Sequence, residues 1–268
     1  STGDIKAISN LERSPYRNGY VEGMNRAVRG FEPGSVVKTL SMMVAVEDGL
    51  VHNLDSVITT GHGYPYAGGR PITDSHSVPS MTVNEVIERS SNIGMAKIIT
   101  RAYGDKPSRW RERIAQLGFL DRLGSGIAEE MAPYFPRVKD DRGGRIALSR
   151  MSYGYATEIP PMHTLSIYNA IANGGRYVRP RLIKGLKDGS IDSVMPVSYV
   201  RDRVCSEETA RKMQAMLKSV VWGDHGTARS LRSDLVAVAG KTGTCWMIDT
   251  ATHKYNPAHK RLAFCGFF

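Results

Sequence analysis

The chain has 268 residues, of which 41% are hydrophobic, so it can bury a core as one large domain or as two lobes. Its net charge of +10 comes without an RNA-binding signature or a stripe of aromatic and basic residues, so we expect no nucleic-acid partner; a basic surface facing an anionic envelope, or simple solubility, explains the charge equally well. Three cysteines without a C-x-x-C pair and seven histidines without an H-E-x-x-H motif predict neither a disulfide-built domain nor a metal site, and we expect no cofactor.

The first third of the chain predicts one strand and one buried helix. Residues 5–9 follow a turn signal and are expected to form a first strand, whereas residues 10–34 are polar and irregular. A helix is then expected to begin near Ser35, with apolar residues almost all round. It is too short to span a membrane and too apolar for a protein surface. We expect it to be the central helix of a domain, followed over residues 50–80 by a long loop with room for one short strand.

The middle of the chain predicts mainly helices. A capping box, Thr82-Val83-Asn84-Glu85, opens a helix over about 83–89, and a break at Ser90-Ser91-Asn92 separates it from a second helix over about 93–103. Glycine and capping signals predict two further helices, at 107–117 and from 163 or 164 to 174, separated by a Gly- and charge-rich loop over 121–147.

The last third predicts strands around one amphipathic helix that Ser206 caps. The expected strands are residues 176–183, a buried strand at 235–239 that leads into Lys241, and residues 261–268 after a loop over 248–260. Strands at both ends with helices between them predict an α+β fold, in which an antiparallel sheet carries helices on both faces. We expect one domain over residues 1–268, with sheet-forming parts near 1–10 and 176–268 and an inserted, mainly helical lobe near 35–175.

One pair of residues at the start of the central helix has the spacing of a nucleophile and its base. Lys38 follows Ser35 by one helical turn, so its amine can lie on the same face as the hydroxyl. Burial disfavours the charged form of a lysine, and a neutral amine beside a hydroxyl can act as a general base. A helix cap followed by a snorkelling lysine would use the same two residues, so the pair alone leaves both interpretations open.

Two further motifs follow in the chain, Ser90-Ser91-Asn92 and Lys241-Thr242-Gly243-Thr244. Taken singly they could be loop caps and an ordinary strand end. A phosphate-binding loop at Lys241 would need a glycine at position 235, where the chain has Leu235, and a G-x-S-x-G elbow is absent. Together, S-x-x-K, S-x-N and K-T-G in this order are typical of penicillin-binding proteins and of class A β-lactamases.

The chain resembles the transpeptidase domain of the penicillin-binding proteins over nearly its whole length. The resemblance rests on the three motifs and on further matching stretches: Thr2–Ala7, Phe31–Ser35, Ser90–Gly94 in the style of the monofunctional class B proteins, Tyr153–Tyr155 with Pro160-Pro161, and Gly226–Ala228. It implies the transpeptidase-like fold, without the family's last strand and C-terminal helix and without its N-terminal anchor and pedestal. We therefore expect the chain to be part of a longer protein.

The resemblance also implies a role for each motif residue in acyl transfer. Ser35 would attack the carbonyl of a D-Ala-D-Ala stem peptide, Lys38 would take its proton, and Ser90 would pass a proton to the leaving group. It leaves open which amine is the base at each step, Lys38 or Lys241 acting with Ser90. The resemblance also implies that Lys241 polarises Ser90 and that Asn92 holds Lys38 and the substrate amide. Thr242 and Thr244 would bind the substrate carboxylate, and Gly243 would leave room for a peptide along the strand edge. The backbone N–H groups of Ser35 and Thr244 would form the oxyanion hole.

The implied function is a peptidoglycan D,D-transpeptidase that β-lactams acylate at Ser35. A D,D-carboxypeptidase, a serine β-lactamase and a non-enzymatic β-lactam sensor remain as alternatives. The chain lacks the E-x-x-L-N segment of class A β-lactamases, and Asn92 disagrees with the S-x-V motif of class D enzymes and of the sensors.

The resemblance further implies partners and a location. The partners would be peptidoglycan stem peptides, β-lactams, a glycan polymerase and proteins of division or elongation, with the Ser90–Gly94 run favouring division. The resemblance implies a site at the extracytoplasmic face of the bacterial cytoplasmic membrane. Because the chain has no apolar run of 18 residues and no signal peptide, we expect the anchor outside this chain. Cys245 and Cys265 come near each other in the final hairpin, and we expect two small core residues there in preference to a disulfide.

Overall fold

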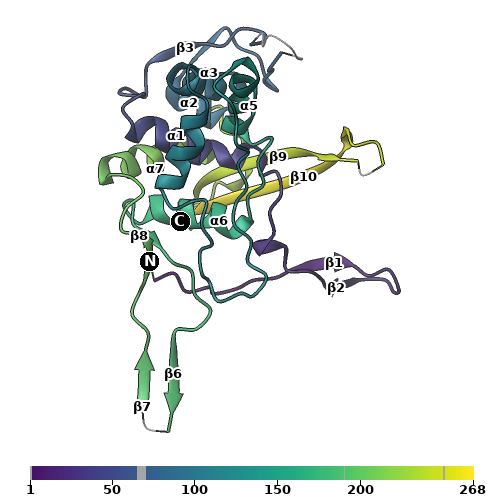
Figure 1. Ribbon diagram of the computed structural model, residues 1–268, viewed down its shortest axis with the longest axis vertical. Coiled ribbons are helices and arrows are strands. Elements are labelled where there is room, and N and C mark those ends of the chain that lie inside the picture. The colour runs from purple at the N-terminus through teal and green to yellow at the C-terminus, as the bar shows by residue number, and fades with distance from the viewer. Residues whose placement is uncertain (1, 65–70, 190, 250) are drawn as a thin grey trace.

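The central helix α1 (Lys38–Glu47) lies in the interior of the molecule, where its residues from Lys38 to Val46 are all buried (Figure 1). The computed structural model describes residues 2–64, 71–189, 191–249 and 251–268. The bounds of the other helices are α2 (Val83–Glu88), α3 (Asn92–Tyr103), α4 (Ser108–Gln116), α5 (Arg142–Tyr153), α6 (Pro161–Ala172) and α7 (Glu207–Trp222). Of these, α3, α5 and α7 contact α1. None of the helices in the described ranges is both long and apolar enough to cross a membrane.

Local capping explains why several of these helices begin where the sequence predicts. The Thr82 hydroxyl accepts from the backbone N–H of Glu85, and the Glu85 carboxylate accepts from the N–H of Thr82, which completes the capping box of α2. The side chains of Ser91 and Ser206 cap α3 and α7 in the same way. The amphipathic face of α7 is fully buried against α1, α2 and strand β9, as its periodicity predicts.

The predicted loop over 121–147 is wrong at its end, because α5 already begins at Arg142. Two glycines in its first turn lower the helix propensity of this segment. The Asp141 side chain nevertheless accepts a hydrogen bond from the N–H of Gly144, and a Cβ on Gly144 would lie 1.8 Å from the carbonyl oxygen of Lys139. The close approach of the Lys139 backbone, five residues earlier, therefore requires the glycine that the propensity argues against.

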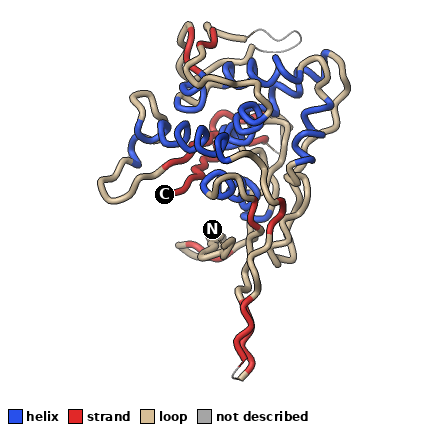
Figure 2. The backbone as a smooth tube through the Cα atoms, turned by 90° about the vertical axis from the view of Figure 1, so that its left-hand side faces the viewer, coloured by secondary structure: helices blue, strands red, loops and turns tan. Residues whose placement is uncertain are grey.

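The longest sheet is the antiparallel hairpin of β9 (Ala239–Ile248) and β10 (Tyr255–Phe267), which pairs Gly243 with Ala263. Helix α7 packs against β9 and α6 against β10, so the mixture of helices and antiparallel strands agrees with the expected α+β fold. The other described pairs are short antiparallel hairpins or ladders, of which β6–β7 extends away from the rest of the structure (Figures 1 and 2): β1 (Leu11–Arg13) with β2 (Tyr20–Glu22), β3 (Val57–Thr59) with β4 (Ser80–Thr82), β5 (Tyr177–Val178) with β8 (Tyr199–Arg201), and β6 (Gly185–Asp188) with β7 (Ile191–Val194).

The predicted first strand is wrong. Residues 5–9 are all described and form no strand, and the N-terminal segment makes only one isolated bridge, between Asp4 and Arg181. Ile5 and Ala7 instead line a cavity of about 920 Å³ whose other wall includes residues 263–267 of β10 and Phe268 after it. The segment therefore faces the hairpin across a cavity and does not pair with it.

Several strand boundaries also differ from the prediction. Residues 10–34, expected to be irregular, contain β1 and β2. In the 50–80 stretch, β3 is the one short strand for which the prediction left room, and β4 begins only at Ser80; residues 65–70 of this stretch lie outside the described residues. Only Tyr177–Val178 of the strand expected at 176–183 is extended in a ladder, and β6, β7 and β8 were not predicted. Leu235 is 92% exposed, and β9 begins only at Ala239 because the apolar run before it crosses the surface without a pairing strand. Strand β10 begins at Tyr255, within the predicted loop.

Cys245 and Cys265 are both free thiols. The register pairs Cys245 with Arg261 and Cys265 with Lys241, so the two cysteines are not opposite each other in the hairpin. Cys245 is buried and Cys265 is partly buried, which agrees with the expectation of small packed residues in place of a disulfide.

Candidate active site

Ser35 and Lys38 meet at the junction of a 3₁₀ turn, η2 (Gly34–Val37), with α1. The α-helix begins at Lys38, so Ser35 lies inside the 3₁₀ turn that precedes the helix expected to begin near it. The turn still advances the chain by about one helical turn, because the N–H of Lys38 donates to the carbonyl of Ser35. The Lys38 amine is 3.0 Å from the Ser35 hydroxyl oxygen, as the spacing predicts.

The second motif reaches the same amine from the turn between α2 and α3. Lys38 Nζ lies 2.6 Å from the carbonyl oxygen of Ser90, 3.2 Å from its hydroxyl, and 2.7 Å from Oδ1 of Asn92. Ser90 has a left-handed backbone with φ of 60°, which costs a non-glycine residue roughly 1 kcal/mol or more. The structure therefore holds Ser90 in a strained turn in which its carbonyl and its hydroxyl both face Lys38.

Burial controls the charge of Lys38. The side chain is completely buried, and this desolvation lowers the pKa of Lys38 from 10.5 to about 7, while the negative charge of Asp74 acts in the opposite direction. Near neutral pH a large fraction of the amine is thus uncharged and can accept the proton of the Ser35 hydroxyl.

Asp74 was not predicted, although it holds the second motif in place. Its Oδ1 accepts from the backbone N–H groups of Asn92 at 2.6 Å and Ile93 at 3.1 Å, and its Oδ2 accepts from the Ser91 hydroxyl at 2.5 Å. A carboxylate in this position satisfies free N–H groups at the start of α3 and interacts favourably with the helix dipole. A single aspartate in a polar loop carries no sequence signal of this role, because its partners are 17 to 19 residues away.

The Asn92 side chain makes hydrogen bonds through both its oxygen and its nitrogen. Oδ1 accepts from Lys38, and Nδ2 donates to the carbonyl oxygen of Thr73 at 3.0 Å. The predicted contact with Lys38 is therefore present. One N–H and one lone pair of this amide remain for a substrate.

The third motif lies on β9, next to η2. Lys241 is completely buried, and its pKa is lowered well below 10.5 by desolvation and then by the nearby charge of Lys38. Its amine donates to the carbonyl oxygen of Thr242 at 3.1 Å. The Thr242 hydroxyl is 2.7 Å from that of Thr227, and Thr244 is exposed. Lys241 thus lies within electrostatic range of Lys38, and the two threonines are on the outer face of the strand.

The backbone between η2 and β9 is packed too closely for side chains. A Cβ on Gly34 would lie 2.9 Å from the carbonyl oxygen of Thr244, and one on Gly154 would lie 2.0 Å from the carbonyl oxygen of Gly34. A Cβ on Gly243 would lie 3.0 Å from Val36 and 3.2 Å from the carbonyl oxygen of Pro33. Glycine at 243 therefore lets η2 pack directly on this face of β9, and the expected room for a peptide along the strand edge stays a prediction.

Glu32, directly before the nucleophile turn, connects this turn to the hairpin. Its Oε1 accepts from the N–H of Ala156 and from the hydroxyl of Tyr255, both at 2.8 Å, and its Oε2 is 3.6 Å from the thiol of Cys245. These partners belong to the turn before α6, to β10 and to β9. Sequence reasoning did not assign Glu32 this function, because its partners are more than 100 residues away along the chain.

A family model described as the penicillin binding protein transpeptidase domain matches residues 1–268. The chain belongs to this family. The transpeptidase domain is 30% identical over 245 residues to penicillin-binding protein PbpB of Mycolicibacterium smegmatis, covering 88% of the chain and 36% of that protein. It is 28% identical over 254 residues to peptidoglycan D,D-transpeptidase FtsI of Escherichia coli, covering 91% of the chain and 39% of that protein.

Solved structures agree with the fold. The transpeptidase domain superposes on penicillin-binding protein 3 of Mycobacterium tuberculosis with a TM-score of 0.79 at 28% identity, over 91% of this chain and 55% of that one. That protein has also been solved in complex with ampicillin. The chain covers 36% of PbpB and 39% of FtsI, so it spans well under half the length of these curated relatives. The predicted family and the predicted transpeptidase fold are both confirmed.

Proposed function

We propose that this domain is a serine D,D-transpeptidase that cross-links the stem peptides of the cell wall. The observation that carries the proposal is the buried amine of Lys38, which has a pKa of about 7 and lies 3.0 Å from the Ser35 hydroxyl. A neutral amine at hydrogen-bond distance from a hydroxyl is the arrangement that generates a nucleophile for acyl transfer. The named activity of the Escherichia coli relative supports the choice of substrate.

In the proposed reaction, Ser35 Oγ attacks the carbonyl carbon between the two terminal D-alanines, and its proton moves to Lys38. Collapse of the tetrahedral intermediate breaks the C–N bond, and the departing D-alanine takes a proton through Ser90, whose hydroxyl lies 3.2 Å from Lys38 Nζ. An amine of a second stem peptide then attacks the acyl-enzyme and restores Ser35. The backbone N–H groups of Ser35 and Thr244 are proposed as the oxyanion hole, which the close approach of Gly34 to the Thr244 carbonyl supports.

Binding of the donor peptide is proposed along β9. Among the described residues β9 pairs only with β10, so its other edge can accept an added strand. Thr242 and Thr244 offer hydroxyls that can donate hydrogen bonds to the terminal carboxylate. The same groups would receive a β-lactam, as supported by the ampicillin complex of the Mycobacterium tuberculosis relative.

The cellular context is proposed from the relatives. We place the domain at the extracytoplasmic face of the bacterial cytoplasmic membrane as a single unit of a longer, anchored protein. A glycan polymerase and proteins of cell division are the proposed partners, because FtsI of Escherichia coli is among the similar proteins.

Labelling with a fluorescent penicillin tests the nucleophile. The domain should form a stable covalent adduct, Ser35→Ala should form none, and Ser233→Ala, on the loop before β9, should label normally. Equal labelling of Ser35→Ala would disprove the assignment.

A stem-peptide donor, supplied with and without an amine acceptor, tests the reaction. Cross-linked product that appears only with the acceptor supports transpeptidation, whereas release of D-alanine into water alone indicates a carboxypeptidase. Rapid release of hydrolysed penicillin indicates a β-lactamase, and a stable adduct with no turnover of any donor indicates a sensor.

A further inference from the structure

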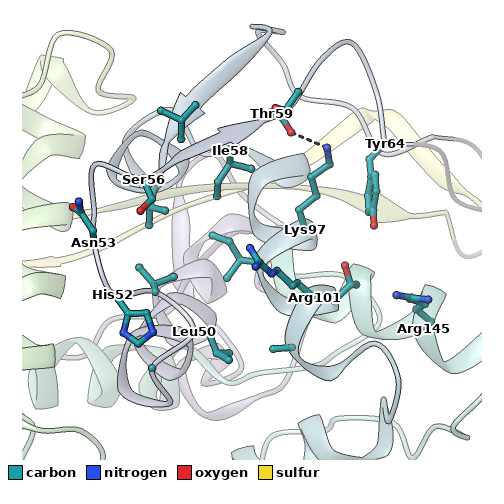
Figure 3. A pocket seen from close by; sticks show the side chains of 17 residues that line it. Leu50, His52, Asn53, Ser56, Ile58, Thr59, Tyr64, Lys97, Arg101 and Arg145 are labelled. Atoms are coloured by element: carbon teal, nitrogen blue, oxygen red, sulfur yellow. Dashed lines mark hydrogen bonds between the residues drawn. The ribbon is translucent and has the colours of Figure 1, made fainter.

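A cavity of about 840 Å³ lies between the β3 segment and α3, and no catalytic residue lines it (Figure 3). This volume falls within the range of roughly 300–1,000 Å³ that is typical of small-molecule sites. Its walls come from the chain after α1, from β3, from the start of α2, from α3 and from α5.

Three positive side chains line the cavity, together with neutral polar groups. Lys97 and Arg101 extend from α3, and Arg145 lies at the end of the cavity opposite His52 (Figure 3). A Cβ on Gly104, three residues after Arg101, would lie 2.9 Å from Nε of Arg145. Arg145 therefore packs against the C-terminal end of α3. No aspartate or glutamate is among the described residues that line the cavity.

Two of these positive charges lie close together on one helix. Lys97 and Arg101 are four residues apart on one helix face, where like charges destabilise the helix. Lys97 is partly compensated, because its amine donates to the carbonyl oxygen of Thr59 at 2.7 Å and lies 5.3 Å from the centre of the Tyr64 ring. Arg101 makes no hydrogen bond or ion pair within the described part of the chain. Its guanidinium therefore keeps all its donors available to a ligand.

The remaining lining suits the body of a small organic molecule. Leu50, Val51, Ile58 and Ile98 supply apolar surface, and Tyr64 supplies a ring at one wall. Side chains four residues apart on a helix have Cβ atoms about 5–6 Å apart, which allows two anionic groups of one ligand to be bound at once.

We propose that this cavity binds a small organic dianion, whose carboxylate or phosphate groups contact Lys97 and Arg101 while its body lies against Tyr64 and the aliphatic wall. The site is separate from Ser35 and does not depend on the proposed reaction. Dicarboxylates and phosphate compounds share the chemistry that this lining recognises.

Ligand-observed NMR on the domain, at a constant ionic strength of about 0.15 M that screens its net positive charge, tests the proposal. Succinate represents the dicarboxylates and inorganic pyrophosphate the phosphates, and the probe that binds more tightly identifies the source of the anion. Saturable binding of at least one probe is expected. The double variant Lys97→Gln/Arg101→Gln should lose about tenfold or more of the affinity, since it removes two charged hydrogen-bond donors.

Arg109→Gln is the matched control, because it removes one positive charge from the exposed surface of α4 outside the cavity. It should bind the probe as the unmodified domain does. The exposed single variant Arg101→Gln should fold normally and lose affinity severalfold, which keeps the test informative if the double variant is unstable. Absence of saturable binding for both probes, or an equal loss in Arg109→Gln and Arg101→Gln, would overturn the proposal.

Discussion

The pH dependence of Ser35 acylation follows from the buried amine of Lys38. If neutral Lys38 is the base, the acylation rate is proportional to its uncharged fraction. With a pKa of about 7 that fraction is roughly one half at pH 7 and nearly complete at pH 9, so the rate should rise only about twofold between them. A lysine with its ordinary pKa would give a rise of about a hundredfold over the same interval. From pH 7 down to pH 5, the rate should fall about fiftyfold.

Stopped-flow acylation with a fluorescent penicillin measures this profile. Lys38→Met should acylate very slowly with no midpoint near pH 7. In Lys241→Gln the midpoint should remain, because burial and not the charge of Lys241 lowers the pKa of Lys38. A hundredfold rise between pH 7 and 9, or a midpoint that persists in Lys38→Met and disappears in Lys241→Gln, would refute the assignment of Lys38 as the base.

Three further predictions concern the groups around this amine. Between pH 7 and 9 the lysine at position 38 holds its proton in the unfolded chain but loses it in the folded one, so the free energy of unfolding should rise with pH. Urea titrations at both pH values should show a rise about 2 kcal/mol larger than in Lys38→Met. Asp74→Asn removes a charge that raises the pKa of Lys38, so the acylation midpoint should move to lower pH, with a loss of about 1–3 kcal/mol of stability by urea unfolding; an unmoved midpoint would contradict this electrostatic role. Gly154→Ala should cost about 3 kcal/mol or more in thermal unfolding, since its Cβ would lie 2.0 Å from the Gly34 carbonyl oxygen, whereas Gly126→Ala, also at positive φ but with no atom within 4 Å, should cost only about 1 kcal/mol; equal costs would exclude the clash as the cause.

The sequence predicted best those features that depend on residues close together in the chain. The capping box at Thr82 and Glu85 and the cap at Ser206 are hydrogen bonds across three residues, and both are present. The proximity of Ser35 to Lys38 depends on a single helical turn, which either an α-helix or the observed 3₁₀ turn provides.

The strand predictions were weaker, because an extended segment needs a partner that its own residues do not specify. Residues 5–9 and 235–238 have apolar patterns suited to strands, yet the first faces a cavity and the second crosses the surface. The start of α5 was missed because Gly144 has a low helix propensity. The close approach of the Lys139 backbone nevertheless requires glycine at this position.

The presence and order of the three motifs, and the apolar helix that follows the first of them, can be recognised from the residues alone. The chemistry of the proposed site depends on the folded structure. Desolvation of Lys38 requires a completed core around it, and Ser90, Asn92 and Asp74 reach its surroundings from segments more than 30 residues away. Electrostatic energies depend on distance and burial in space, so no inspection of the S-x-x-K segment alone could have set the pKa of its lysine.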